Sequence, residues 1–566
     1  MREQIRTTMR RLGILLVALS AWSGVASAQS WLNVPTPPRA FNAGNALQLT
    51  DGTIMVQEYG TSNWWELTPD EHADYNHGTW SQLASATTPA LPEDYAPFEF
   101  AAAVLKDGRV IVEGGEYTFS KGVRKKTFTN QGAIYDPVLN SWAPVPAPCR
   151  MDSKGKCEPN TEWKIIGDGP SIVLPDGTFM LGAVYSTKVA LLDVPTMTWT
   201  IVSPKGKFDK NYEEGWTLLP PIPKVNGLPN PEDGNVLTVD AYLGAPAMGS
   251  KDYLENNSEI YDPATKEWTS AGDTKKPLTN TLITCDGVTG AHEVGPAVLR
   301  PDGTVFATGA GTCGAGHTAI YLPSAGTMGL WTAKGNIPSG NNMNDAPAAV
   351  LQDGNVLVLT SPGKHPPSTF YEFDLKTNKF LPTPIPPPPG FRAGSSTSED
   401  GRMLVVSSGH VLFIHNGSPS EEMGFYVPQG TYEPLWTPFV NSIGVPISSD
   451  KKYTIYRGGP YIVSGTQLNG LSQGAYFGDE NQAATNYPLV QIENCQTGHK
   501  FFARTYNFST MGVATGPLTI VSATYMVTPN IELGPSTLTV IANGIPSPPF
   551  EGLCVVDVQG SPPLGN

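Results

Sequence analysis

Carboxylates recur at a nearly fixed distance before Asp-Gly dipeptides, and this spacing is the feature of the sequence most able to do chemistry. An acid stands eight residues before three of these dipeptides and nine before a fourth, where Pro301 adds a residue; a fifth acid is followed by an insertion. These acids are Glu99, Asp168, Asp345, Glu293 and Glu213. Carboxylates gathered in one place raise one another's pKa, so they must share protons, bind a cation or pair with a base.

The same register holds Arg392 before the last Asp-Gly and Ala43 before the first. Arg392 could therefore pair with the acids. Three interpretations stay open. Each carboxylate could accept backbone N–H groups and hold neighbouring units together. The acids could instead form a polar pocket that recognises a ligand, or they could bind a hard cation such as Ca²⁺, which takes six to eight oxygens.

The Asp-Gly dipeptides themselves mark a repeat with a period of about 47 to 69 residues. An Asp-Gly pair accepts the positive φ values of a type I′ turn, so each unit is predicted to open with two antiparallel strands. Seven such contexts occur, at Asp51, Asp107, Asp176, Asp233, Asp302, Asp353 and Asp400.

The second half of the unit is also regular. In four units, a hydrophobic or aromatic residue directly precedes an Asp, and an aromatic residue lies seven positions after that first residue. This spacing predicts a third strand, a turn and a fourth strand. The pairs are Tyr135 with Trp142, Leu192 with Trp199, Tyr261 with Trp268 and Phe373 with Phe380. Seven four-stranded units stacked around an axis would bury their apolar faces, so we expect an all-β protein with a seven-bladed β-propeller. A long array of β-sandwiches is the alternative.

Composition supports this fold class and indicates a destination. The 59 Gly and 53 Pro among 566 residues leave little room for long helices. Residues 1–28 combine four Arg, an apolar stretch and a small-residue cleavage site, which is typical of a signal peptide. Removing four Arg and one Glu from 36 basic and 51 acidic residues leaves a net charge near −18. This charge argues against nucleic acid or anionic membranes as partners.

The mature chain is predicted to have two domains, no membrane span and structural disulfides. The propeller is expected over residues 29–440 and a small Ig-like β-sandwich over 441–566, where the repeat stops. The six cysteines suggest the pairs Cys149 with Cys157, Cys285 with Cys313 and Cys495 with Cys554. We expect a secreted protein, periplasmic or extracellular, that is a monomer.

The repeat unit, together with Gly114-Gly115, resembles kelch repeats. A secreted kelch propeller followed by an Ig-like domain of the E-set type resembles the galactose oxidase and glyoxal oxidase family. The closing segment Leu538 to Ser547, with Asn543 before a Gly-Ile-Pro-Ser turn, is similar to the last strand of that family. The resemblance covers nearly the whole mature chain.

That family uses a mononuclear copper and a Tyr-Cys radical, but the resemblance places other residues at each ligand position. Glu99 replaces the cross-linking Cys, Asp168 the radical Tyr, Tyr185 the stacking Trp, Phe391-Arg392 a Tyr-His pair, and Thr505-Tyr506 the Thr-His loop of the Ig-like domain. Copper(II) favours imidazole and phenolate ligands. The sequence therefore predicts no copper cofactor, and a structural Ca²⁺ stays open.

Two functions remain as leading hypotheses. The first is a binding module whose carboxylates accept hydrogen bonds from the hydroxyls of an extracellular carbohydrate or small polyol, while Tyr185 or Tyr506 covers an apolar sugar face. The second is a non-redox acid-base enzyme acting on a glycan or uronate, with Asp168 or Glu99 as base, Tyr506 as acid and Arg392 stabilising negative charge. Glu293, Asp345 and Glu213 would contact the substrate. A purely structural or adhesive role and a copper-radical oxidase are weaker alternatives.

Overall fold

The computed structural model describes residues 30–83, 91, 95–149, 163–208, 210–211, 215–221, 234–239, 258–276, 278, 294–309, 315–323, 328–448, 452–477 and 486–557. In these ranges the chain is all-β, and its helices are six short 3₁₀ turns. They are η1 (Tyr75–His77), η2 (Pro338–Gly340), η3 (Ala393–Ser395), η4 (Ser398–Asp400), η5 (Ser420–Glu422) and η6 (Pro434–Trp436). No helix in the described ranges is long and apolar enough to cross a membrane.

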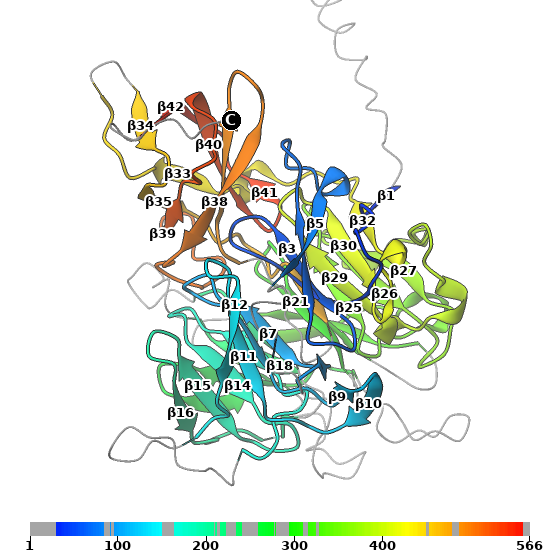
Figure 1. The fold of residues 1–566 in the computed structure, drawn as a ribbon. Coiled ribbons are helices and arrows are strands. Elements are labelled where there is room, and N and C mark those ends of the chain that lie inside the picture. The colour runs from blue at the N-terminus through cyan, green and yellow to red at the C-terminus, as the bar shows by residue number, and fades with distance from the viewer. Residues whose placement is uncertain are drawn as a thin grey trace, which may run out of the picture.

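Seven sheets of four or five strands follow one another along the described chain (Figure 1). Sheet 1 contains β2 (Asn42–Gln48), β3 (Ile54–Glu58), β4 (Trp64–Thr68) and β5 (Thr79–Leu83), and sheet 2 contains β7 (Ala101–Val104), β8 (Val110–Glu113), β11 (Gly132–Asp136) and β12 (Ser141–Val145). Sheet 3 contains β13 (Ser171–Val173), β14 (Phe179–Gly182), β15 (Val189–Asp193) and β16 (Thr198–Val202). Sheet 4 contains β17 (Gly215–Leu218), β18 (Val236–Val239), β19 (Ser258–Asp262) and β20 (Glu267–Ser270). Sheet 5 contains β21 (Val294–Leu299), β22 (Val305–Gly309), β23 (Thr318–Leu322) and β24 (Leu330–Ala333). Sheet 6 contains β25 (Pro347–Val350), β26 (Val356–Thr360), β27 (Thr369–Asp374) and β28 (Lys379–Phe380). Sheet 7 contains β29 (Gly401–Val405), β30 (Val411–His415) and β32 (Gly424–Val427), and its fourth strand is β1 (Ser30–Asn33) from the start of the chain.

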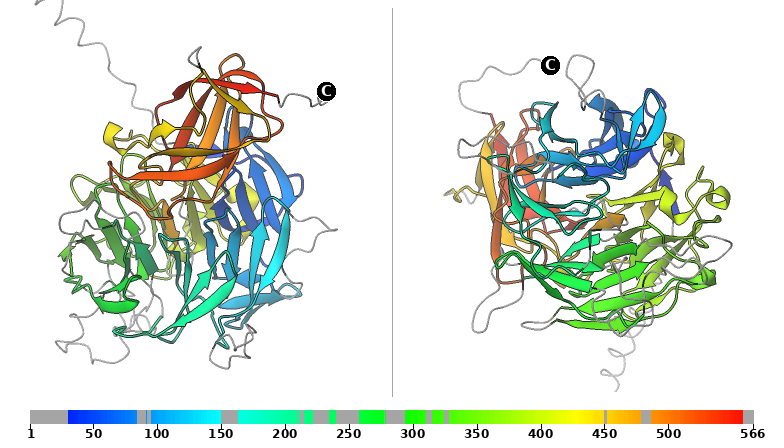
Figure 2. Two further views of the ribbon diagram at one scale, coloured as in Figure 1. Left: turned by 90° about the vertical axis from the view of Figure 1, so that its left-hand side faces the viewer. Right: turned by 90° about the horizontal axis from the view of Figure 1, so that it is seen from below.

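The first strands of these sheets lie around a common axis (Figure 2). The strand β7 contacts β13, and the contacts continue through β17, β21, β25 and β29 to β2. Sheets 1 and 2 close the ring, because the indole of Trp64 packs 6.3 Å from the Phe100 ring and 5.7 Å from Trp142. This is the arrangement of a β-propeller.

Two short segments join the beginning of this ring to its end. The strand β1 (Ser30–Asn33) pairs antiparallel with β32 and is the outermost strand of sheet 7. The strand β31 (Ser418–Pro419) pairs with the start of β2. The ring is therefore closed by backbone hydrogen bonds between its two termini, which the repeat pattern alone did not indicate.

The first hairpins occur where Asp-Gly predicts them, but their turn type differs from the prediction. In the first, Leu49 N–H donates to Thr53 O at 2.8 Å and Gly52 N–H to Leu49 O at 3.0 Å. Only Gly52 of the dipeptide has a positive φ, at 81°. The Asp51 carboxylate accepts the Thr53 N–H at 3.2 Å, which holds Asp51 in an ordinary turn conformation. The turns are thus three-residue loops with glycine in the left-handed region.

The Asp-Gly pair at Asp400 is not a hairpin turn, which corrects the seventh repeat. Gly401 is the first residue of β29, and the turn lies at Val406–His410, where Val406 N–H donates to His410 O at 3.0 Å. The residue that shares the register of Glu99 and Asp168 in sheet 7 is therefore Asp400, not Arg392. Each of these acids lies six residues before the start of its turn.

The second half of the unit follows the prediction in four sheets. The partners predicted from the seven-residue spacing stand opposite each other on paired strands, as Tyr135 and Trp142 do. In each turn the Asp carboxylate accepts backbone N–H groups, and one residue has a positive φ. Those residues are Asn140, Met197, Lys266 and Asn378.

The C-terminal strands form a nine-stranded assembly on one end of the ring (Figures 1 and 2). Its strands are β33 (Phe439–Ser442), β34 (Tyr453–Tyr456), β35 (Pro460–Thr466), β37 (Leu489–Asn494), β38 (Lys500–Tyr506), β39 (Ile520–Met526), β40 (Gly534–Ala542), β41 (Ile545–Pro546) and β42 (Phe550–Val556). Another strand, β36 (Ala475–Phe477), leaves this assembly and pairs antiparallel with β25 at the axis.

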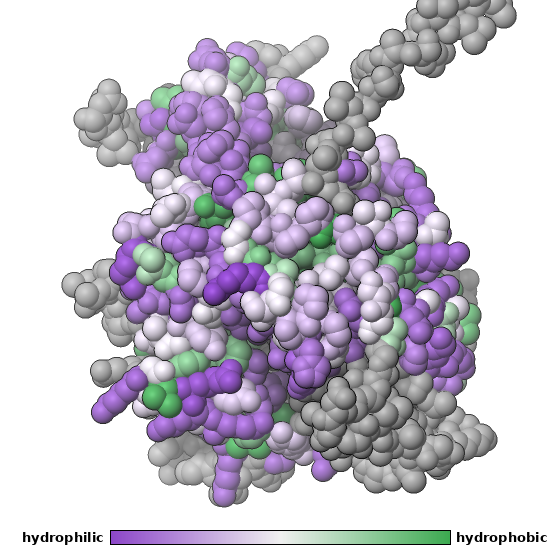
Figure 3. All heavy atoms as spheres, turned by 90° about the vertical axis from the view of Figure 1, so that its right-hand side faces the viewer, coloured by the Kyte–Doolittle hydropathy of each residue, from purple (hydrophilic) through white to green (hydrophobic). Residues whose placement is uncertain are grey.

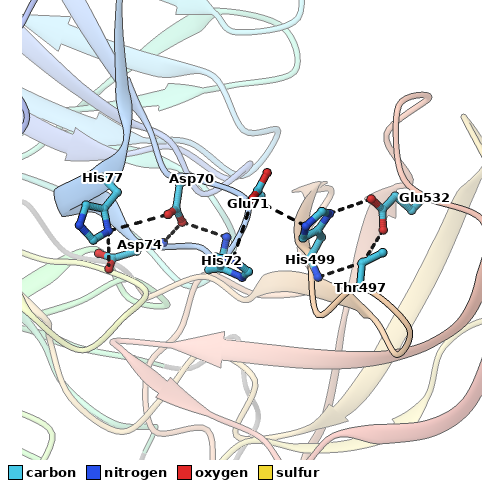
Figure 4. Close-up of polar contacts among 8 residues, drawn as sticks. All are labelled: Asp70, Glu71, His72, Asp74, His77, Thr497, His499 and Glu532. Carbon is cyan, nitrogen blue, oxygen red and sulfur yellow. Dashed lines mark hydrogen bonds and ion pairs between the residues drawn. The ribbon is translucent and has the colours of Figure 1, made fainter. Parts of the chain in front are cut away.

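The C-terminal strands rest on the hairpin turns of the ring. Tyr487 donates a hydrogen bond to Gln48 O, and Thr505 N–H donates to Thr50 O at 3.0 Å. A polar junction lies beside these contacts (Figure 4), in which His499 Nδ1 lies 2.7 Å from Glu532 Oε1 and its Nε2 lies 3.7 Å from Glu71 Oε1. The junction thus joins β38 to the loop before β5.

The predicted disulfide between Cys495 and Cys554 is wrong, because both thiols are free. The reason is the sheet order: Cys554 stands opposite Pro535 on one side of β40, and Cys495 N–H donates to Pro535 O on the other side. Strands two apart lie roughly 9.5 Å from each other, beyond the reach of a disulfide. Cys149 is buried and disulfide-bonded. Cys157, Cys285 and Cys313 lie outside the described residues, so their pairings stay predictions.

Candidate functional site

The seven first strands all run in the same direction, so the ring has two ends. We call them the strand-start end, where these strands begin, and the hairpin end, where they turn. The predicted acids Glu99, Asp168 and Asp345 precede β7, β13 and β25 and therefore lie at the strand-start end with Asp400. Glu213 and Glu293 lie outside the described residues, and their roles stay predictions.

Several residues at the strand-start end have left-handed backbones, which is costly for side chains other than glycine. Glu99 has a φ of 53°, Asp345 of 39°, Tyr185 of 59° and Phe128 of 46°. Such a conformation costs on the order of 1 kcal/mol or more for each residue and persists where the surroundings impose it. The outer turns with Asn140 or Lys266 repeat from sheet to sheet and belong to the architecture. Glu99 and Asp345 share one register position in sheets 2 and 6, each six residues before the start of its turn, whereas Tyr185 follows β14.

Backbone contacts bring Glu99 and Asp168 to neighbouring positions on sheets 2 and 3. Glu116 N–H donates to Glu99 O at 2.9 Å, and Gly115 N–H donates to Gly167 O at 2.6 Å. Glu99 is half-buried, and Asp168 is only 7% exposed. The two carboxylates predicted to act together therefore lie on adjoining segments.

The axis itself contains buried amides. Gln473 and Asn344 are each 1% exposed, and neither side-chain amide has a hydrogen-bond partner in the described ranges. Gln473 lies on the segment that enters the ring, where its N–H donates to Leu299 O at 3.0 Å. Buried polar groups are normally satisfied by protein, water or ligand. These amides make the axis polar rather than a closed apolar core.

Arg392 does not face the acids predicted to be its partners. Its guanidinium donates to Glu422 Oε1 at 3.0 Å through Nε and at 2.8 Å through Nη2. Glu422 Oε2 lies 2.5 Å from His415 Nδ1, and the hydroxyl of Ser396 lies 3.2 Å from His415 Nε2. This order matches a Ser-His-acid relay, but Ser396 is 2% exposed and donates to Arg392 O. The network fastens the loop before β29 to sheet 7.

Asp400 is also committed to local structure. Its carboxylate accepts the N–H of Thr397 at 2.8 Å and the Thr397 hydroxyl at 3.1 Å, which caps η4. The carboxylate of Asp400 therefore has the structural role left open for the acids, since it accepts a backbone N–H.

The prediction that Tyr506 covers the acids is wrong. The neighbouring Thr505 is hydrogen-bonded to Thr50, at the hairpin end. The distance from there to the strand-start end is about seven residues of strand, or roughly 23 Å. The segment that enters the axis is instead the one ending in β36, whose Phe477 stands opposite Pro347, two residues from Asp345.

In the described ranges, no three His, Cys, Asp or Glu residues are grouped so that they could hold a metal ion.

Sequence reasoning missed a basic and aromatic group beside Glu99. A small sheet of β6 (Pro97–Phe98), β9 (Tyr117–Ser120) and β10 (Val123–Lys126) extends from sheet 2. Arg124 Cζ lies 4.8 Å from the ring centre of Tyr117, and its charge influences Tyr59. The signal that could have identified this hairpin is the pair of aromatic residues at 117 and 119, followed by Gly122 and the basic residues at 124–126.

Charges in this group act on the two tyrosines. Burial raises the pKa of Tyr59, and Arg124 opposes that rise while Glu99 adds to it. Burial, Glu116 and Glu99 raise the pKa of Tyr117 to about 12. Glu99 therefore lies close enough to both phenols to influence them, and both stay protonated at neutral pH.

A cavity lies at the hairpin end. Its volume is about 360 Å³, and its lining includes Asp107, Asp176, Asp193, Asn507 and Phe508. The carboxylates of Asp107, Asp176 and Asp193 already accept hydrogen bonds within their own turns. This cavity therefore lies where the C-terminal strands meet the turns.

No protein family and no curated protein matches the chain. A comparison with solved structures finds similarities at very low sequence identity. The extracellular domain of the putative hybrid two-component system BT4673 from B. thetaiotaomicron is 11% identical with a TM-score of 0.40; the match covers 94% of this chain and 60% of that one. A streptogramin B lyase structure is 9% identical with a TM-score of 0.40, covering 70% and 97% of the two chains.

YCF48 from Cyanidioschyzon merolae is 9% identical with a TM-score of 0.35, covering 72% of this chain and 100% of that one. This chain spans about three fifths of the BT4673 domain. All three TM-scores lie below 0.5, so the fold is assigned from the sheets and their order alone.

Proposed function

We propose that this chain is a secreted, seven-bladed kelch propeller with an Ig-like C-terminal domain, and that it binds a carbohydrate or small polyol at its strand-start end. The observation that carries the proposal is the pair of strained acids, Glu99 and Asp345, on two different sheets at the same end of one ring. Strained backbones cluster at functional sites. Carboxylates there can accept hydrogen bonds from adjacent hydroxyls.

Two further features support a saccharide. Tyr185 is 43% exposed and packs edge-on against Phe128, with the ring centres 5.3 Å apart, so an aromatic face is accessible beside the acids. Aromatic faces pack well on the apolar face of a sugar ring. Residues 1–28 and the negative net charge support a secreted protein that contacts neither nucleic acid nor membrane.

Binding to a glycan panel tests this proposal. The double variant Glu99→Gln/Asp168→Asn should weaken saccharide binding at least about ten-fold, since each lost charged hydrogen bond contributes about 1.5–3 kcal/mol. The matched control Asp107→Asn/Asp193→Asn changes the same kind of groups at the hairpin end and should leave affinity unchanged. Absence of binding to every glycan, or equal losses in both double variants, would contradict the proposal.

Acid-base catalysis on a glycan is the second candidate. The geometry removes Tyr506 and Arg392 from the roles predicted for them, but Tyr59 and Arg124 lie beside Glu99 and could serve as the acid and the charge-stabilising group. Turnover separates the two candidates. A variant Tyr59→Phe that still binds the glycan but no longer converts it would favour the enzyme, and wild-type binding without conversion would favour the binding module.

A further inference from the structure

The β9–β10 hairpin carries an unusual concentration of positive charge for this protein. Four basic residues occupy positions 121–126, in a chain whose formal net charge is −15. All four residues of β10 are exposed. These residues are Lys121, Arg124, Lys125 and Lys126. Because this hairpin is positively charged and lies beside carboxylates, it favours a ligand that carries both an anionic group and neutral polar groups.

Arg124 is held in a fixed orientation without an acidic partner. Its guanidinium lies 4.8 Å from the ring centre of Tyr117 and 5.5 Å from that of Phe98. In the described ranges it forms no ion pair, whereas Lys126 is paired with Glu116. An arginine that is oriented by two aromatic rings, but not neutralised, is prepared to bind an anion.

The hairpin joins Arg124 to the strand-start end. Phe98 directly precedes Glu99, and Lys126 Nζ lies 4.7 Å from the ring centre of Phe128, which packs against Tyr185. Arg124, Glu99 and Tyr185 therefore line adjoining parts of one surface. A ligand that contacts Glu99 through its hydroxyls can reach Arg124 with a neighbouring substituent.

Resting on the proposed function, we infer that the preferred ligand is a uronate-bearing oligosaccharide. Its carboxylate would bind the planar guanidinium of Arg124 in a two-pronged contact, the geometry that arginine offers and lysine does not. Its hydroxyls would donate to Glu99, and its ring would lie against Tyr117 or Phe119. A dense polyanion such as nucleic acid is less suited, because the chain has a formal net charge of −15.

Calorimetric titration of matched oligosaccharides tests the inference. Trimers of galacturonate, glucuronate and mannuronate are each compared with the neutral trimer of the same ring, in 50 mM and 200 mM salt. At least one uronate trimer should bind about ten-fold tighter than its neutral counterpart, as expected for one charged hydrogen-bonded contact. The preference should shrink at the higher salt concentration.

The variant Arg124→Gln should abolish this preference and leave neutral binding within two-fold of wild type, and Arg124→Lys should retain only part of the preference. Arg39→Gln is the matched control, because Arg39 also stacks on an aromatic ring, 5.1 Å from the centre of Trp65, but is ion-paired with Glu58. It should keep the full preference. Thermal melting checks that each variant is folded.

The outcomes separate this inference from the proposed function. Neutral trimers bound as tightly as uronates, or equal losses in Arg124→Gln and Arg39→Gln, would overturn the uronate inference and leave carbohydrate binding standing. Binding of DNA or anionic vesicles in place of uronates would overturn it as well. No binding of any trimer would overturn both.

Discussion

The two ends of the propeller are built differently, although the same strands connect them. At the hairpin end, Asp carboxylates cap the turns in five sheets by the same contact to a backbone N–H, and the C-terminal strands cover part of these turns. At the strand-start end the connections differ from sheet to sheet, and Glu99, Asp345 and Tyr185 have strained backbones.

The hairpin end is thus built from one repeated contact, whereas the strand-start end is not. The Asp carboxylates that recur from sheet to sheet cap the turns under the C-terminal strands. The left-handed backbones at the strand-start end cost stability, so these residues are the ones to examine for a ligand. The face of the molecule drawn in Figure 3 is mostly hydrophilic, with apolar residues among the polar ones.

The largest expected effect tests the hairpin end. A Cβ at Gly52, where φ is 81°, would overlap the ring of Phe502. Gly52→Ala should therefore lower the free energy of unfolding by about 2–4 kcal/mol, through backbone strain and overpacking together. The control is Gly122→Ala, which has a φ of 75° but open space around it and should lose only about 1 kcal/mol. Equal losses in a denaturant titration would show that the contact with Phe502 is unimportant.

The second effect concerns a buried acid at the strand-start end. Glu113 ends β8, is fully buried, and neither of its oxygens has a hydrogen-bond partner in the described ranges; burial raises its pKa well above the usual value. The contribution of Glu113 to stability is therefore fully present below about pH 4.5, where the carboxyl is protonated in the folded and the unfolded chain. As pH rises from there to the folded pKa, this contribution is lost, and the free energy of unfolding falls by up to about 1.4 kcal/mol per pH unit.

The variant Glu113→Gln should consequently be more stable than wild type at pH 8, by roughly 1–3 kcal/mol, and should match it near pH 4.5. Melting temperatures measured from pH 4.5 to 8 check this. Glu551→Gln, at an exposed position, serves as control and should leave stability nearly unchanged. A Glu113→Gln difference that does not grow with pH would contradict a neutral buried carboxyl.

The third effect links strain to binding. Glu99→Gly should raise the free energy of unfolding by about 0.5–1 kcal/mol, since glycine adopts a positive φ without steric cost. The same variant should weaken saccharide binding. Lys266→Gly, at a φ of 58° in an outer turn, should give a similar gain in stability with binding unchanged. If both variants bind like wild type, the strain at Glu99 has no functional role.

The smallest effect lies at the junction in Figure 4. Hydrogen bonds from Thr497 and His499 lower the pKa of Glu532, so its stabilising contribution is present above about pH 4.5 and is lost as pH falls through its folded pKa. Because Glu532 is partly exposed, Glu532→Gln should cost at most about 0.5 kcal/mol at pH 7. A cost above 2 kcal/mol in chemical denaturation would show that this contact holds the C-terminal strands in place.

The sequence predicted what depends on local chemistry and misplaced what depends on long-range pairing. Asp-Gly and the seven-residue aromatic spacing located the hairpins because turn and strand preferences act over a few residues. The partner of β1, the path of β36 into the axis and the order of β37, β40 and β42 join distant segments. Tyr506 and the Cys495–Cys554 pair were misjudged for this reason.

The same limit affected the site. The Asp-Gly pair at Asp400 lies at the start of a strand and not in a turn. Because this pair has the sequence of a turn, the repeat pattern assigned to Arg392 the register position that Asp400 occupies. Arg124 was overlooked because its relation to Tyr59 and Glu99 arises only when β9 and β10 fold back beside sheet 1. Glu99 and Asp168, by contrast, were placed correctly at one end of the ring because each lies a fixed distance from a genuine turn.

Hydrogen–deuterium exchange with the tightest-binding saccharide of the panel tests the central claim most directly, because it reports on both ends of the propeller in one experiment. Ligand at the strand-start end should protect the peptides that contain Glu99, Tyr117 and Tyr185 and leave the turns around Asp107 and Asp176 unchanged. Protection confined to those turns and to Asn507, which line the cavity at the hairpin end, would contradict the account.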